Sequence, residues 1–302
     1  MNSLKSQTLK MLWVSGLAFS LGIGWTNYPS WAGDPFRQTS PKNIGDQTEY
    51  AFELLFAQGD YKGAKDSLKS AIVTEADEPL AHALMGSLAY TEEDWETLKT
   101  QAQKTLQAAK KLSVQDPVRG NLYLAVANFL EGAYVFEKQG PLGAINKLQQ
   151  VFAYLDKAEE LDPQDPELNL IKGYMDLLLA VNLPFSTPDQ AIDRLTKFAS
   201  PDYLVNRGIA VAYRDLDKLE QAIVAVDSAL KATPDNPELY YLKGQILYKM
   251  AKKQQNVAIF EEALTNFAKA LTKSHQLPKF ITKSLKREHR KTQEKIQALK
   301  TG

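Results

Sequence analysis

Hydrophobic side chains along most of this chain recur at intervals of three and four residues, the spacing that places them on one face of an α-helix. Prolines and short polar turns separate these stretches, and few segments alternate strictly between apolar and polar residues. Proline is tolerated at the start of a helix but not in its interior, so each proline marks a boundary. The pattern predicts an all-α fold.

A proline followed by glycine seven residues later begins several of these helical stretches. The segments 166–173 (PELNLIKG) and 237–244 (PELYYLKG) match closely and lie 71 residues apart. A third copy at 201–208 lies midway between them, and a fourth occurs at 79–86. A fixed period of about 35 residues indicates stacked supersecondary units, each of which buries its apolar face against its neighbours.

A second pattern follows within the units. A small residue precedes an apolar residue by four positions, and a further alanine comes three positions later. These spacings place all three side chains on one helical face, where small residues allow a neighbouring helix to approach closely. The four sets are Ala64/Leu68/Ala71, Val151/Leu155/Ala158, Ala222/Val226/Ala229 and Ala263/Phe267/Ala270.

Together these motifs resemble the tetratricopeptide repeat (TPR), a helix–turn–helix unit of about 34 residues. The resemblance implies a right-handed superhelical solenoid of hairpins with a C-terminal capping helix. We expect about six hairpins in residues 46–274, namely 46–76, 79–113, 117–161, 166–199, 201–232 and 237–274. The third is oversized and lacks the expected glycine, and the fourth contains an extra loop at Pro184.

Residues 275–302 are predicted to form one polar helix, which suits the cap that an open-ended solenoid requires. From Lys273 to Lys300, nine Lys and Arg side chains oppose Glu288 and Glu294, a net charge of +7. This helix either presents a solvated face or docks the chain, as a peripheral subunit, on an anionic complex or membrane surface. The candidate docking residues are Lys279, Lys283, Lys286, Arg287, Arg290 and Lys291.

The N-terminal residues have the pattern of a secretory signal peptide. Lys5 and Lys10 precede an apolar run at 11–24, and Ser30 and Ala32 form a small-x-small cleavage site. The run is shorter than the roughly 20 residues of a membrane span, which favours cleavage after Ala32 over a retained anchor. We expect a signal peptide at 1–32 and a flexible leader at 33–45.

This signal pattern predicts export by the general secretory route to a periplasm, or to a thylakoid lumen if the source is cyanobacterial. Signal and repeats together resemble exported TPR proteins of cyanobacterial type.

Composition excludes several kinds of chemistry. The chain has no cysteine, so it forms no disulfide, thiolate zinc site or iron–sulfur cluster. Basic and acidic side chains both number 36, so no global field favours nucleic acid. The three histidines lie far apart in the sequence and do not cluster with several other metal-type ligands, and no phosphate-binding glycine loop or nucleophile elbow occurs. We expect no cofactor, no metal and no catalytic residues.

The TPR resemblance also implies a concave groove lined by the first helix of each hairpin. Counted from each glycine, the groove positions are Leu170, Tyr174, Leu177, Leu178, Val205, Ile209, Tyr213, Tyr241, Gln245 and Tyr248. An apolar, tyrosine-rich strip suits a helical or extended segment of a partner protein. The predicted function is a scaffold that helps to assemble or maintain an envelope or membrane complex. Alternatively, the third hairpin or the C-terminal helix covers part of the strip.

Overall fold

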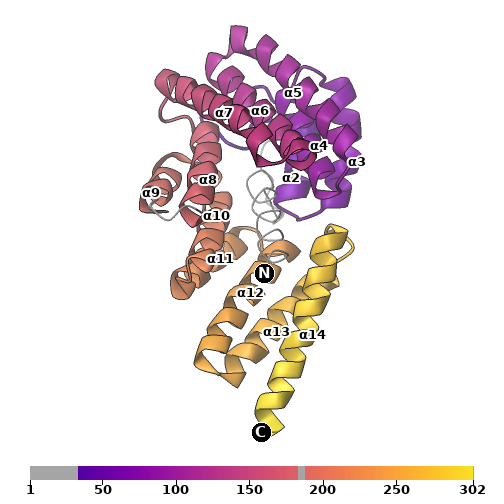
Figure 1. The fold of residues 1–302 in the computed structure, drawn as a ribbon, viewed down its shortest axis with the longest axis vertical. Helices are drawn as coiled ribbons and strands as arrows, with labels where there is room; N and C mark the ends of the chain where they lie inside the picture. Colours follow the sequence, from indigo (N-terminus) through magenta and orange to yellow (C-terminus); the bar gives the residue numbers. More distant parts are fainter. Residues whose placement is uncertain (1–32, 183–187, 302) are drawn as a thin grey trace.

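The computed structural model describes residues 33–182 and 188–301, which form helices joined by short turns (Figure 1). Twelve of the helices pair in chain order. The pairs are α2 (Asp46–Phe56) with α3 (Tyr61–Thr74), α4 (Pro79–Thr91) with α5 (Trp95–Gln115), α6 (Pro117–Gln139) with α7 (Pro141–Leu161), α8 (Pro166–Asn182) with α9 (Pro188–Phe198), α10 (Asp202–Asp215) with α11 (Leu219–Ala232), and α12 (Pro237–Gln254) with α13 (Val257–Thr272). The predicted signal peptide and the Pro184 loop lie outside the described residues.

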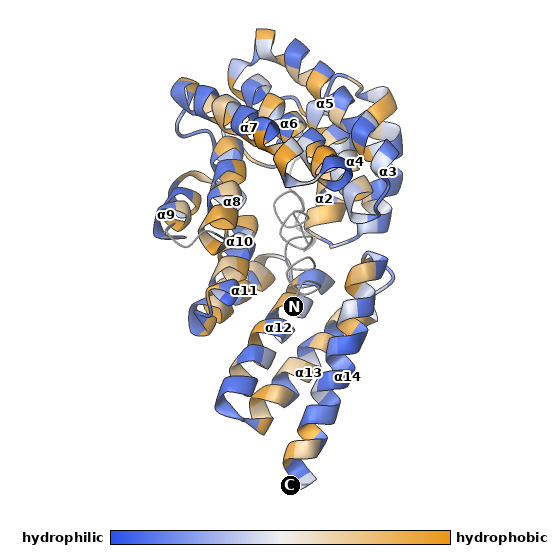
Figure 2. Cartoon of the chain, in the orientation of Figure 1, coloured by the Kyte–Doolittle hydropathy of each residue, from blue (hydrophilic) through white to orange (hydrophobic). Residues whose placement is uncertain are grey.

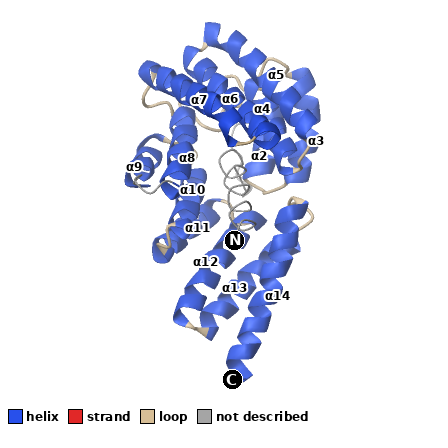
Figure 3. Ribbon diagram, in the orientation of Figure 1, coloured by secondary structure: helices blue, strands red, loops and turns tan. Residues whose placement is uncertain are grey.

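The last helix, α14 (Lys279–Thr301), packs on α13 at one end of the array and is largely hydrophilic (Figure 2). Neighbouring hairpins stack on one another, so a continuous core runs through the molecule. Within the described ranges all regular structure is helical (Figure 3). The prediction of an all-α helical solenoid is confirmed.

The repeat motifs mark the contact between the two helices of a hairpin. Ala263, Phe267 and Ala270 of α13 are fully buried. A Cβ atom added to Gly244 of α12 would lie 2.5 Å from the ring of Phe267. Likewise, a Cβ on Gly173 of α8 would lie 2.5 Å from the Cγ of Leu195. Glycine in the first helix therefore provides the space that a large side chain of the second helix fills.

The leader expected to be flexible, residues 33–45, is packed against the body of the protein. Phe36 and Ile44 are buried, and the Phe36 ring meets that of Phe52 edge to face at 5.1 Å between centroids. Arg37 forms an ion pair with Asp165, with 2.6 Å between Nη2 and Oδ2. The low apolar content of the segment suggested flexibility, but two apolar side chains and one arginine with partners in other hairpins hold it in place.

Arg37 belongs to a buried charge cluster that joins the leader to α4, α6 and α8. We define this cluster as Arg37, Glu78, Arg119 and Glu167. Arg119 contacts Glu78 at 3.0 Å and Glu167 at 2.9 Å, and Arg37 contacts Glu167 at 3.1 Å. Tyr123 also donates a hydrogen bond to Glu167. Burial raises the pKa of the Glu167 carboxyl, but attraction by Arg119 and Arg37 outweighs it, so that pKa lies below its usual value.

The first hairpin also contacts the sixth, so the array closes on itself. The Tyr61 amide donates to the Gln276 carbonyl at 3.1 Å, and the Asn236 side chain donates to the Phe56 carbonyl at 3.4 Å. Gly59 lies between these contacts with a positive φ of 62°, and an added Cβ would lie 2.7 Å from the Asn236 Oδ1. The turn between α2 and α3 thus fits closely against the start of α12.

Glu49 of α2 predicts a pH-dependent stability. Burial, together with repulsion from Glu53, Asp46 and Asp34, raises the pKa of its carboxyl from 4.5 to about 7. Because this pKa is raised in the folded state, the stability that Glu49 contributes is present below the unfolded pKa and is lost as pH rises through the folded value. The variant Glu49→Gln should therefore exceed the wild type in free energy of unfolding by about 1 kcal/mol at high pH, discounted for partial exposure.

Chemical denaturation at about pH 5 and about pH 8 measures the difference, which should shrink at the lower value. The control is Glu160→Gln on an exposed position of α7, which should leave the pH dependence unchanged. Equal pH dependence in the wild type and Glu49→Gln would contradict the prediction.

Candidate partner-binding site

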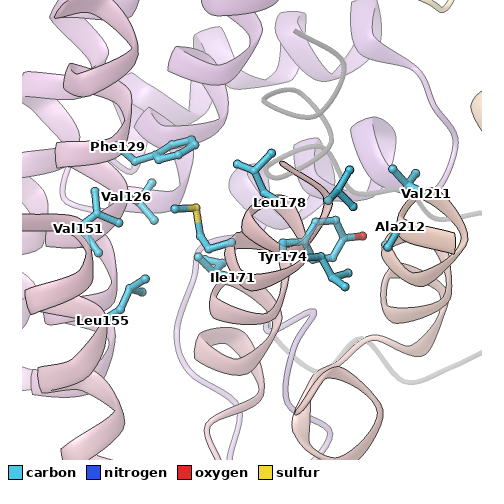
Figure 4. A pocket seen from close by; sticks show the side chains of 14 residues that line it. Val126, Phe129, Val151, Leu155, Ile171, Tyr174, Leu178, Val211 and Ala212 are labelled. Carbon is cyan, nitrogen blue, oxygen red and sulfur yellow. The ribbon is translucent and has the colours of Figure 1, made fainter. Parts of the chain in front are cut away.

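An apolar hollow lies where the third, fourth and fifth hairpins meet (Figure 4). Figure 4 shows side chains from α6 and α7 on one side, α8 in the middle and α10 on the other side. The lining includes Val126 and Phe129 of α6, Val151 and Leu155 of α7, Ile171, Tyr174 and Leu178 of α8, and Val211 and Ala212 of α10. Most of these residues are three or four positions apart within their helix and so share a helical face, as Val211 and Ala212 do with Gly208 of α10.

The chemistry of this hollow is almost entirely apolar. Its volume is about 40 Å³, far below the several hundred cubic ångströms of a typical small-molecule pocket. No charged side chain lines it. The single polar lining group is the Tyr174 hydroxyl, which donates to the Leu204 carbonyl at 2.7 Å. The hollow can accept apolar side chains of a partner, but it offers no acid, base or ligand for a cofactor.

An exposed apolar surface lies on α7, the helix that also contributes Val151 and Leu155 to the hollow. Leu142 is 82% exposed, and Ile145 and Leu148 are also exposed, while Phe152 is half-buried. Steps of three and four residues make successive members of this set neighbours on the helix. We name Leu142, Ile145, Leu148 and Phe152 the α7 strip. Exposed apolar patches of this kind mark interaction surfaces more often than single exposed side chains do.

Only part of the predicted groove belongs to this surface. Tyr174, Leu177 and Leu178 line the hollow as predicted positions on α8. Leu170, Val205 and Ile209 are instead buried in the core between hairpins.

The C-terminal helix covers another part of the predicted groove. Tyr241 is 1% exposed, and Gln245 donates from Nε2 to the Glu288 Oε2 of α14 at 3.1 Å. Tyr248 packs edge to face on Phe260, at 5.5 Å between centroids, next to Ile296 of α14. The alternative in which the C-terminal helix covers part of the predicted groove therefore applies to the groove positions on α12.

Tyr213 of α10 is half-buried, and the Lys218 Nζ lies 5.7 Å from its ring centroid. It does not line the hollow.

Counting from the glycines missed the contributions of α6 and α7. The third hairpin has no glycine at the expected position, so positions carried over from regular repeats could not be assigned to it. A different signal was present in the sequence. The buried face of α7 is formed by Val151, Leu155 and Ala158, so the apolar side chains of Leu142, Ile145 and Leu148 lie outside it.

Neither a metal site nor a membrane span has support in the described part of the chain. Residues 33–182 and 188–301 contain no cluster of three or more His, Asp or Glu that could hold a metal. His82 is packed, with Nδ1 2.9 Å from the Gln101 Oε1 and Nε2 3.0 Å from the Ala76 carbonyl. Within the same ranges, every helix is too short or too polar to span a bilayer.

Comparison with known families identifies the C-terminal hairpins. A family model described as TPR repeat matches residues 201–250, and one described as Tetratricopeptide repeat matches residues 237–268. These residues form α10 to α12 and most of α13. No curated protein matches the chain. The repeats support a role in protein–protein interaction. The chain is thus an all-α helical-repeat protein whose fifth and sixth hairpins match models of the tetratricopeptide repeat.

Proposed function

We propose that this protein is a non-catalytic scaffold that holds an apolar-faced segment of a partner protein against the hollow and the α7 strip. The observation that carries the proposal is that α7 bears exposed apolar side chains and also helps to line the apolar hollow. Leu142, Ile145 and Leu148 are exposed, and the lining that follows them contains no charged group. Burial of this surface against a partner would remove apolar area from water, which is the main driving force of association.

The dimensions favour a helical partner segment. From Leu142 to Leu155 the surface follows α7 for about 20 Å, since a helix rises 1.5 Å per residue. A partner helix of three to four turns, with apolar residues at i, i+3, i+4 and i+7, matches this length. The hollow is small enough to take one or two apolar side chains from such a helix.

The compartment is part of the proposal. The pattern of residues 1–32 supports export, and a scaffold there would help to assemble or maintain an envelope or membrane complex. Mass spectrometry of the protein recovered from its native compartment tests this, because cleavage after Ala32 leaves a chain that begins at Gly33.

The variant Ile145→Asp tests the binding surface. We expect it to weaken binding of display-selected helical peptides at least about ten-fold, because a buried carboxylate without a partner is costly. The position is exposed, so the free energy of unfolding should stay within about 0.5 kcal/mol of the wild type. Fluorescence polarisation with a selected peptide measures the affinity.

The matched control is Val224→Asp, which places the same charge on a 68% exposed position of α11 away from the hollow. This variant should bind as the wild type does. The proposal is wrong if both variants bind equally well, or if no apolar-faced peptide is selected by the folded protein.

A further inference from the structure

Cationic side chains line the outward face of α14. Its inward face is formed by Ile281, Leu285, Thr292 and Ile296, which are buried. We define the basic stripe as Lys279, Lys283, Lys286 and Arg290, which are all exposed. Their spacings of four, three and four residues place them in one sector of the helix, on the side away from the buried side chains. The stripe is straight and about 17 Å long. The other predicted docking residues, Arg287 and Lys291, are exposed beside it.

The stripe differs from the cations at the two ends of residues 273–300 in its lack of close acidic partners. At the two ends of this segment, Lys273 pairs with Asp235 at 3.3 Å and Lys300 pairs with Glu261 at 2.6 Å. Among the described residues, by contrast, Lys279, Lys283 and Lys286 form no ion pair. Arg290 has a loose, exposed pairing with Glu294 at 3.6 Å.

Like charges at these spacings repel one another and weaken the helix that carries them. Contacts within the chain therefore do not account for the stripe.

We propose that the basic stripe docks this protein on the surface of a bilayer that contains anionic phospholipid. A bilayer presents phosphate groups at every position along a straight line, so four aligned cations can all be neutralised at once. The described part of α14 exposes no large apolar side chain, which indicates adsorption at the headgroups without insertion.

The charge of the remaining chain would fix the orientation of the docked protein. Residues 273–300 carry a net charge of +7, whereas residues 33–272 carry a net charge of about −9. An anionic surface attracts the first and repels the second, so α14 would face the bilayer and the hairpins would extend away from it. This inference does not depend on the segment bound at the α7 strip.

Vesicle co-sedimentation of residues 33–302 tests the proposal. We expect binding to phosphatidylcholine vesicles that contain about one-third phosphatidylglycerol at about 0.1 M salt, and loss of binding at about 0.5 M salt, where screening is stronger. Pure phosphatidylcholine vesicles should not bind the protein. The variant Lys279→Gln/Lys283→Gln/Lys286→Gln/Arg290→Gln should bind at least about 30-fold more weakly, since each cation near the surface contributes about five-fold.

The matched control, Lys62→Gln/Lys69→Gln/Lys104→Gln/Lys110→Gln, removes four exposed positive charges from α3 and α5. It should bind within about three-fold of the wild type. Equal losses in both variants would show attraction by net charge alone and would overturn the proposal. Absence of vesicle binding by the wild type would also overturn the proposal. This includes the case in which the stripe binds an acidic protein but no vesicle. Peptide binding at the α7 strip should be the same in all three proteins, which separates this test from that of the scaffold.

Discussion

Replacing Arg119 with methionine should lower the free energy of unfolding by about 3–5 kcal/mol, because it leaves the buried carboxylates of Glu78 and Glu167 without their shared cation. Arg37 still contacts Glu167 but not Glu78, so it cannot restore the balance. Methionine retains much of the packing of the arginine stem, so the loss reports on charge. Urea denaturation followed by circular dichroism measures the change.

The control is Lys197→Met, which breaks the exposed pair of Lys197 with Asp193 at the surface of α9. Its effect should be below about 1 kcal/mol, as is usual for solvated ion pairs. A loss of similar size in both variants would mean that the charge cluster does not hold α4, α6 and α8 together.

The second large effect is expected at Gly244. Alanine is normally favoured over glycine inside a helix by about 1 kcal/mol, yet here its Cβ would lie 2.5 Å from the Phe267 ring. We expect Gly244→Ala to lower the free energy of unfolding by about 2 kcal/mol, because overpacking forces α12 and α13 apart. Chemical denaturation gives the value.

A double-mutant cycle distinguishes this clash from a general loss of stability. Phe267→Leu removes the ring that meets the new Cβ, so Gly244→Ala should cost at least about 1 kcal/mol less in that background than in the wild type. Additive effects of the two substitutions would show that the glycine has no special contact with Phe267.

The hairpins could be predicted because their signals are local. Proline at a helix start and glycine within the first helix act over a few residues, and the structure places helix boundaries close to them. The outward face of α14 could be predicted for the same reason, since an amphipathic helix with one apolar face leaves its cations exposed.

Long-range contacts could not be predicted in this way. The leader is held by Arg37 and Asp165, which are 128 residues apart in the sequence, and no local pattern pairs them. The lining of the hollow was predicted only in part, because regular repeat positions were applied to α10 and α12, where packing against α14 and between hairpins buries most of them. Tyr174 and Leu177 line the hollow, and α8 is the helix that retains the regular position of its glycine.

The closure between the first and sixth hairpins has a consequence for folding. An open array of repeats unfolds in steps from its ends, because a terminal repeat contacts only one neighbour. Here the turn between α2 and α3 is bound to Gln276 and Asn236, so the first hairpin has neighbours on both sides. Closure therefore favours one cooperative unfolding transition over gradual fraying, and it slows folding because contacts between distant segments must form before the ring is complete.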